Sequence, residues 1–194
     1  LLLLILFFFS FIFPVSQMIF WIFKFPNNFN FINLLDLTLN TLQLVFLTTL
    51  LLILLSFITN YGMRISESKF LNLVTSFSVS GYAIPGIILA VTLLGFISFI
   101  SNYLNNDAFK MIFIGTVFGL IIAYCVRFYS LAINGIKTGY DKLNKSLDDV
   151  SYLMGNSKLG TFLYVHFPFL KQNLILIAML VSIDILKELP LTLI

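Results

Sequence analysis

Charged residues are scarce in this sequence, and their scarcity excludes most classes of soluble protein. Charged side chains make up 10% of its 194 residues and hydrophobic ones 60%, with a mean hydropathy of +1.05. Soluble domains carry about 25% charged residues, so this chain has too few polar side chains to cover a core. The net charge of +3 is small and scattered, which excludes the basic footprint of nucleic-acid binding.

Cysteine and histidine are equally rare, with one residue of each. Cys125 cannot form a disulfide within the chain, and together with His166 it cannot build a structural zinc site. His166 has no Cys, Asp or Ser at a spacing useful for catalysis, so we interpret it as an interfacial side chain. The segment from Gly155 to Thr161 has the spacing of a phosphate loop but lacks its Lys. We therefore expect no catalytic residue, no metal, no cofactor and no ATP binding.

Long apolar runs are abundant. Five of them cover about 1–23, 37–60, 79–101, 110–126 and 172–190, each near the ~17–25 residues that cross a bilayer. They predict an all-α, polytopic transmembrane helical bundle of about five spans, forming a single domain over 1–194. Because the chain begins with Leu and stops within an apolar stretch, we expect it to be a fragment.

The positions of Lys and Arg predict the orientation of these spans. Positive residues are retained on the cytoplasmic side of a membrane. With the five predicted spans, two positive residues fall on one side and eight on the other. The pair is Lys24 and Lys110, and the eight are Arg64, Lys69, Arg127, Lys137, Lys142, Lys145, Lys158 and Lys171. The polar segment at about 143–168 is therefore predicted to be cytoplasmic.

This cytoplasmic segment has the pattern of a helix-turn-helix. Ser146 and Asp149 have the spacing of a helix-start signal, and acidic residues in a first turn suit the helix dipole. Gly155 suits the left-handed position that ends a helix. A second helix is predicted from Ser157 to about His166, until Pro168 marks the return to the membrane.

Two interpretations of this hairpin stay open. As an amphipathic hairpin it would lie on lipid headgroups, with Lys142, Lys145 and Lys158 against anionic lipid. As a docking element it would place its apolar face in a groove of a soluble partner protein. A helix-start role is enough to explain Asp149, so that residue does not decide between them.

Polar residues inside the predicted spans are the other candidates for function. Asp184, Lys187 and Glu188 lie in the last span, where ionisable residues are costly and often functional. One interpretation is an anchor at the outer interface, ended by Pro190 and helped by an Asp184–Lys187 ion pair. The alternative is that Asp184 or Glu188 lines an aqueous path.

The third span opens with a sequence that weakens a helix. Gly81 and Gly86 flank Pro85 there. Such a segment is tolerated in a membrane where other helices or water satisfy its backbone groups. We therefore expect it to pack against neighbouring helices or to line a cavity.

Together these segments resemble the permease subunit of binding-protein-dependent ABC importers. Asp149-Val150-Ser151 takes the place of the family's Glu-Ala-Ala motif, Gly155 that of its Gly, and Phe167-Pro168 that of its hydrophobic-Pro pair. The resemblance implies that the hairpin is the coupling helix that docks on an ATPase subunit. The coupling residues it implies are Asp148, Asp149, Val150, Ser151, Gly155 and Pro168.

Other segments are similar to the iron(III)-transport branch of these permeases. They are Asn40-Thr41, the segment from Gly81 to Gly86, Arg127-Phe128, and Lys187-Glu188-Leu189-Pro190. The last is similar to a signature in the second half of two-lobed iron permeases, which implies that this chain is a C-terminal lobe. The residues implied for the path or for helix packing are Gly81, Pro85, Gly86, Asp184, Lys187, Glu188 and Pro190.

The resemblance also implies the setting in which the chain works. Its partners would be ABC ATPase subunits, a periplasmic or lipoprotein solute-binding protein, a second permease lobe, and the lipid of a bacterial inner membrane. The chain would not be an enzyme, because ATP would be hydrolysed by the ATPase. Thiamine and phosphonate importers have similar permeases, and an ATP-independent secondary transporter is the alternative from another class.

Overall fold

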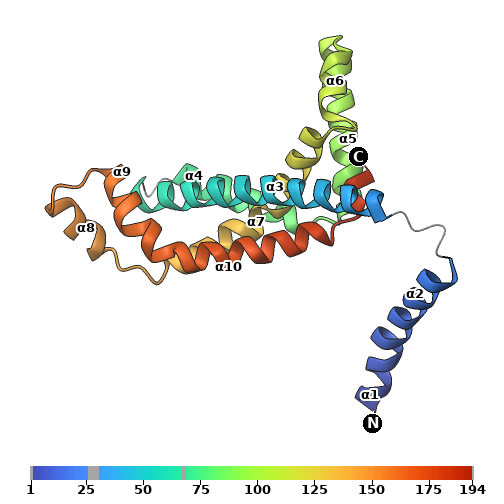
Figure 1. Ribbon diagram of the computed structural model, residues 1–194. Coiled ribbons are helices and arrows are strands. Elements are labelled where there is room, and N and C mark those ends of the chain that lie inside the picture. The colour runs from blue at the N-terminus through green and yellow to red at the C-terminus, as the bar shows by residue number, and fades with distance from the viewer. Residues whose placement is uncertain (1, 26–30, 67–68, 194) are drawn as a thin grey trace. The chain divides into compact units, whose positions relative to one another are not determined.

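The computed structural model describes residues 2–25, 31–66 and 69–193, and most of these residues are helical (Figure 1). Residue 1, the start of the first predicted span, lies outside these residues. Five helical stretches are long and apolar enough to cross a membrane, and no strand occurs among the described residues. The prediction of an all-α polytopic bundle is therefore confirmed. The stretches are Leu3–Lys24, Phe31–Ser66, Gly86–Leu104, Val117–Tyr140 and Lys158–Leu186.

The first apolar stretch belongs to a compact unit of its own, which ends at Thr41. It consists of α1 (Leu2–Phe7), a π-helical turn (Phe8–Ile12) and α2 (Phe13–Lys24). None of the residues of α2 is buried, although the helix is strongly apolar. Its surface is therefore suited to lipid or to another apolar protein surface.

The second unit begins at Leu42, within α3 (Phe31–Ser66). It continues through α4 (Lys69–Val79) and, after a 3₁₀ turn, through α5 (Gly86–Leu104) and α6 (Asp107–Phe113). The remaining helices are α7 (Val117–Tyr140), α8 (Ser146–Leu153), α9 (Lys158–Thr161) and α10 (Phe167–Leu186). A π-helical turn, Phe162–His166, joins α9 to α10, and a 3₁₀ turn, Pro190–Leu193, follows α10.

Helices α7 and α10 lie side by side and form the centre of this unit (Figure 1). The Asn173 amide donates a hydrogen bond to the Gly135 carbonyl at 3.0 Å, and the Tyr124 hydroxyl donates to the Glu188 carbonyl at 3.4 Å. Asn173, near the start of α10, thus meets the second half of α7, and Glu188, just after the end of α10, meets its first half, so the two helices are antiparallel. The apolar core around them includes Leu52, Ala123, Tyr124, Phe128, Ala132, Val181, Ile185 and Leu191.

Several helices extend beyond the bounds that the apolar runs predict, among them α3, which covers Phe31–Ser66 against the predicted 37–60. Helix α7 continues to Tyr140, whereas the predicted span ends at 126, just before Arg127. The last helical stretch begins at Lys158 and passes through Pro168, so this proline does not mark a break. Pro168 lacks the amide hydrogen of an ordinary helical residue, and it stands in the first turn of α10, directly after the π-helical turn.

The third predicted span does break where its glycines and proline stand. The 3₁₀ turn Ser80–Ala83 ends α4, Ile84 and Pro85 are extended, and α5 begins only at Gly86. A Cβ on Gly81 would lie 2.5 Å from the carbonyl oxygen of Val126 in α7. This segment therefore packs against a neighbouring helix, and its backbone approaches α7 more closely than another residue type allows.

Candidate functional site

The cytoplasmic hairpin predicted from the sequence is formed by α8 and α9. Helix α8 begins at Ser146, but the side chain that accepts its amide hydrogen is Asn144, at 3.2 Å. At its other end Gly155 has a φ of +86°. The Gly155 amide bonds the Tyr152 carbonyl at 2.9 Å, and the Asn156 amide bonds the Ser151 carbonyl at 3.1 Å. These two bonds form a Schellman motif, which turns the chain sharply towards α9.

The left-handed conformation at Gly155 leads to a stability prediction. Alanine in this conformation costs roughly 1–2 kcal/mol, whereas asparagine tolerates it better. No heavy atom lies within 4 Å of a Cβ placed on Gly155, so crowding would not add to this cost. We expect Gly155→Ala to speed amide hydrogen exchange in α8 about tenfold and Gly155→Asn to have a smaller effect. Equal exchange rates in the two variants would contradict this explanation.

Hydroxyl groups of α8 and α9 hydrogen-bond the two helices of the hairpin to each other. Ser157 caps α9 by accepting the Gly160 amide hydrogen at 3.2 Å. The Ser151 hydroxyl lies 2.9 Å from that of Thr161. It also accepts a hydrogen bond from the side-chain amide of Asn156. Ser151 is 2% exposed and Thr161 is fully buried. Ser151 therefore holds the hairpin closed from inside and is not part of its outer surface.

A cluster of charged and aromatic side chains, Arg64, Tyr140, Asp148 and His166, attaches the hairpin to three long helices; we call it the anchor cluster. Arg64 Nε donates to Asp148 Oδ2 at 2.6 Å, and His166 Nε2 lies 2.8 Å from Asp148 Oδ1. Both oxygens of one carboxylate are thus engaged. His166 Nδ1 lies 3.4 Å from the Tyr140 hydroxyl.

The anchor cluster also satisfies the backbone where α7 ends. Arg64 donates to the carbonyl oxygens of Leu143 and Asn144, each at 3.0 Å. The Tyr61 hydroxyl donates to the carbonyl of Lys158, and the Tyr61 ring meets His166 edge-on at 5.0 Å. The side chain of Arg64 is only 10% exposed and that of Asp148 16%. Such shielding strengthens charge-assisted hydrogen bonds and makes the loss of one partner costly.

The end of the hairpin exposes apolar side chains. Leu153 is 87% exposed and Met154 79%, while Val150 and Leu159 are also exposed. We call these four residues the apolar tip. Asp149 is exposed as well, in contrast to its neighbour Asp148. The hairpin thus turns Asp148 towards the membrane helices and exposes the four residues of the apolar tip.

A second charged group lies inside the helical bundle. Arg127 Nε lies 3.0 Å from Glu188 Oε2, and Glu188 is 9% exposed. Arg127 stands about 15 Å from the start of α7 and about 20 Å from its end, at a rise of ~1.5 Å per residue. The same guanidinium donates to the Ile84 carbonyl at 2.8 Å, in the break before α5. The pair therefore joins α7, the end of α10 and the broken helix.

Gly86 packs directly against this ion pair. A Cβ placed on Gly86 would lie 2.2 Å from Glu188 Oε1 and 3.1 Å from an Arg127 Nη. Only a glycine leaves room for the two charged side chains at this point. The Glu188 carboxylate accordingly points into the bundle, towards Gly86 of α5 and Arg127 of α7.

The other polar residues predicted in the last span are placed differently. Asp184 accepts a hydrogen bond from the Tyr82 hydroxyl at 3.3 Å. Lys187 is exposed, and no Asp184–Lys187 ion pair forms in the described part of α10. Pro190 begins the 3₁₀ turn after Glu188. Asp184 and Glu188 thus both face the segment from Gly81 to Gly86.

Only weak signals of the anchor cluster are present in the sequence. The interpretation of His166 as an interfacial side chain without a partner is wrong, because Asp148 lies opposite it across the closed hairpin. The assignment of Arg127 to a cytoplasmic loop is also wrong, because it lies within α7. The available signal was that three polar residues stand near the ends of helical segments: Arg64 near the end of α3, Asp148 near the start of α8, and His166 directly before α10. Across the described residues, no three His, Cys, Asp or Glu side chains gather as a metal site would require.

In comparisons with protein-family models, curated proteins and solved structures, nothing matches this chain.

Proposed function

We propose that this multi-pass membrane protein is the permease subunit of an ATP-driven ABC importer in a bacterial inner membrane. It would form part of the solute path, and a separate ATPase subunit would hydrolyse ATP. Five apolar helices and a polar hairpin between the last two support this assignment. The resemblance of the segments around Asp149 and Gly155 to the coupling motif of such permeases points the same way.

The observation that carries the proposal is a firmly attached hairpin with an exposed apolar tip. A docking element needs an apolar surface for its partner and a stiff connection to the membrane helices. The apolar tip supplies the first, and the anchor cluster supplies the second. A hairpin attached in this way to three membrane helices can pass a partner's movement on to them, and this supports the docking interpretation over the lipid-surface one.

The anchor cluster also suggests how a displacement of the hairpin would be transmitted to the membrane helices. Arg64 belongs to α3, Tyr140 ends α7, and His166 lies in the turn that continues into α10. A displacement of Asp148 would therefore act on three long helices at once. Closure of the ATPase would shift these helices between inward- and outward-facing arrangements, a change between two states.

Ferric iron is the solute we propose for this permease. The support is the resemblance of Arg127-Phe128 and Lys187-Glu188-Leu189-Pro190 to the iron(III) branch. Thiamine or phosphonate remain the alternative solutes, since their permeases are similar. The solute-binding protein and a second permease lobe would complete the importer.

One structural observation favours a second candidate function. Secondary transporters place charged groups beside discontinuous helices near the middle of the bilayer. Arg127 and Glu188 lie beside the break at Ile84 and Pro85 in this manner. An ATP-independent transporter is therefore the alternative, and it assigns no role to the apolar tip.

Co-purification from detergent separates the two candidates and tests the tip. We expect an ATPase subunit to co-purify with the full-length protein and Met154→Ser to weaken its binding about tenfold, which equals 1.4 kcal/mol. Met111→Ser is the matched control, because Met111 in α6 is 75% exposed and Met154 is 79% exposed. If no ATPase binds the folded protein, or if both variants bind it equally, the coupling role is wrong.

A further inference from the structure

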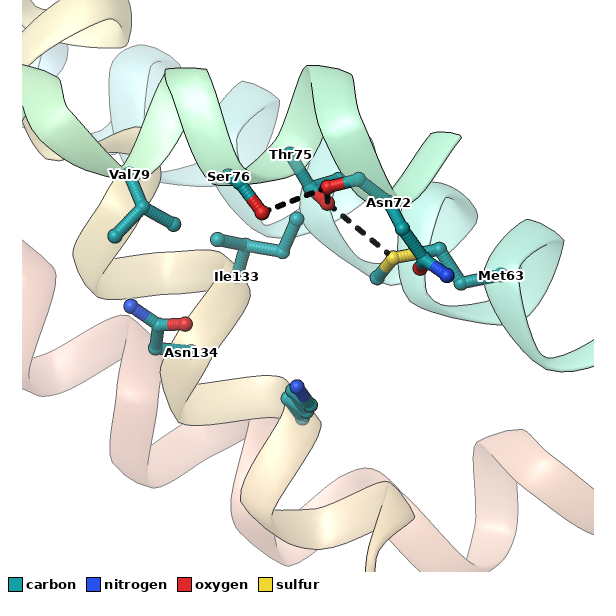
Figure 2. Close-up of a pocket in the computed structure, with 8 residues that line it drawn as sticks. Met63, Asn72, Thr75, Ser76, Val79, Ile133 and Asn134 are labelled. Atoms are coloured by element: carbon teal, nitrogen blue, oxygen red, sulfur yellow. Dashed lines mark hydrogen bonds between the residues drawn. The ribbon is translucent and has the colours of Figure 1, made fainter. Parts of the chain in front are cut away.

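A polar pocket lies between α3, α4 and α7, away from the hairpin and the buried ion pair (Figure 2). Its volume is about 520 Å³. Met63, Thr75 and Ile133 contribute to its wall, and Thr75 and Ile133 are buried. Asn72 and Ser76 of α4 and Asn134 and Lys137 of α7 also line it. Figure 2 shows the Asn72 side chain beside Met63 and the Asn134 side chain beside Ile133. Five of the eight lining residues are therefore polar, in a chain that is 60% hydrophobic.

Three of these side chains have no partner of their own. Among the described residues, the Asn72 and Asn134 amides and the Lys137 ammonium group make no hydrogen bond or ion pair. Ser76 already donates its hydroxyl hydrogen to the Asn72 carbonyl at 2.8 Å, so its oxygen can only accept. The pocket therefore offers hydrogen-bond donors from two amides and one ammonium group.

The charge at the pocket is positive. Among the described residues that line it, Lys137 is the one charged residue, and none is a carboxylate. Asn72 stands in the first turn of α4, which begins at Lys69, and the amide end of a helix carries partial positive charge. Lys137 lies in the last turn of α7, at the end of this helix that the distribution of Lys and Arg predicts to be cytoplasmic.

We propose that this pocket binds an oxyanion, either the phosphate of an anionic phospholipid or a small soluble oxyanion. Basic pockets between membrane helices on the cytoplasmic side are typical binding sites for anionic headgroups. Lys137 would pair with the charge, and the Asn72 and Asn134 amides would donate to the remaining oxygens. The inference is independent of the ATPase and of the transported solute, and it concerns a site that the coupling role does not use.

Native mass spectrometry of the full-length protein tests the lipid arm. We expect the protein to retain one phosphatidylglycerol in preference to phosphatidylcholine. Lys137→Ala should weaken this binding about fivefold to tenfold, as expected for one lysine near a membrane surface. Lys137→Arg should keep it. Lys142→Ala is the matched control, because it removes the same charge from an exposed turn five residues away.

Calorimetric titration with inorganic phosphate tests the soluble arm. Phosphate binding that Lys137→Ala weakens and Lys142→Ala preserves would identify a soluble oxyanion as the ligand. Phosphatidylglycerol retention with the same dependence, not displaced by phosphate, would identify the lipid. Asn134→Ala gives a second variant that keeps the charge, and it should weaken whichever ligand binds. Equal binding by Lys137→Ala and Lys142→Ala in both arms would overturn the proposal.

Discussion

Replacing Arg127 with alanine is expected to destabilise the membrane bundle by about 3–5 kcal/mol, the usual cost of leaving one member of a buried ion pair alone. Glu188 is 9% exposed, and its carboxylate has Arg127 as its ion-pair partner at 3.0 Å. The substitution would also free the Ile84 carbonyl, which accepts a bond from the guanidinium. Reversible unfolding of the purified protein in mixed detergent micelles would measure the loss.

A double variant separates the cost of leaving Glu188 unpaired from the other effects of Arg127→Ala. Replacing both charged residues with uncharged ones of similar size is often close to neutral for a buried pair. We therefore expect Arg127→Met with Glu188→Gln to recover most of the stability that Arg127→Ala loses. Lys187→Ala is the control, since Lys187 adjoins Glu188 but is exposed. If the double variant is as unstable as Arg127→Ala, the unpaired charge is not the cause of the loss.

The pair of Arg127 and Glu188 also shows why apolar runs alone do not predict where α7 ends. The sequence predicts the number and type of the spans because uncharged runs of about 20 residues have few other uses. It places the end of the fourth span at 126, since a charged residue in lipid is costly. Helix α7 continues past Arg127 because Glu188, 61 residues later in the chain, neutralises that charge inside the bundle. Only the packing of α10 against α7 reveals this partner.

The hairpin illustrates the opposite case at two positions, Gly155 and Ser157, where local signals were sufficient. Gly155 has the left-handed conformation that its position predicts, and Ser157 begins the second helix as a cap. These features depend on a few neighbouring residues. The direction in which Asp148 and Asp149 point depends on contacts with α3 and the turn before α10, so the sequence does not distinguish the two carboxylates. The structure separates them into an inward and an outward residue.

Those two neighbouring aspartates allow a matched test of the anchor cluster. Asp148→Asn removes the charge that Arg64 and His166 share, whereas Asp149→Asn removes an equal charge from an exposed position. Hydrogen bonds to charged groups are each worth about 1.5–3 kcal/mol, so losing this charge should loosen the hairpin substantially. We expect amide hydrogen exchange in α8 to quicken at least tenfold in Asp148→Asn and less than about twofold in Asp149→Asn.

The same pair of variants links the anchor to the proposed coupling. If the hairpin transmits force through Arg64, Tyr140 and His166, Asp148→Asn should leave the apolar tip able to bind an ATPase yet reduce solute uptake per ATP hydrolysed. Uptake by reconstituted vesicles, measured together with ATP hydrolysis, would show this uncoupling. A variant that exchanges faster in α8 but transports with unchanged efficiency would mean that the anchor cluster stabilises the hairpin without transmitting its movement.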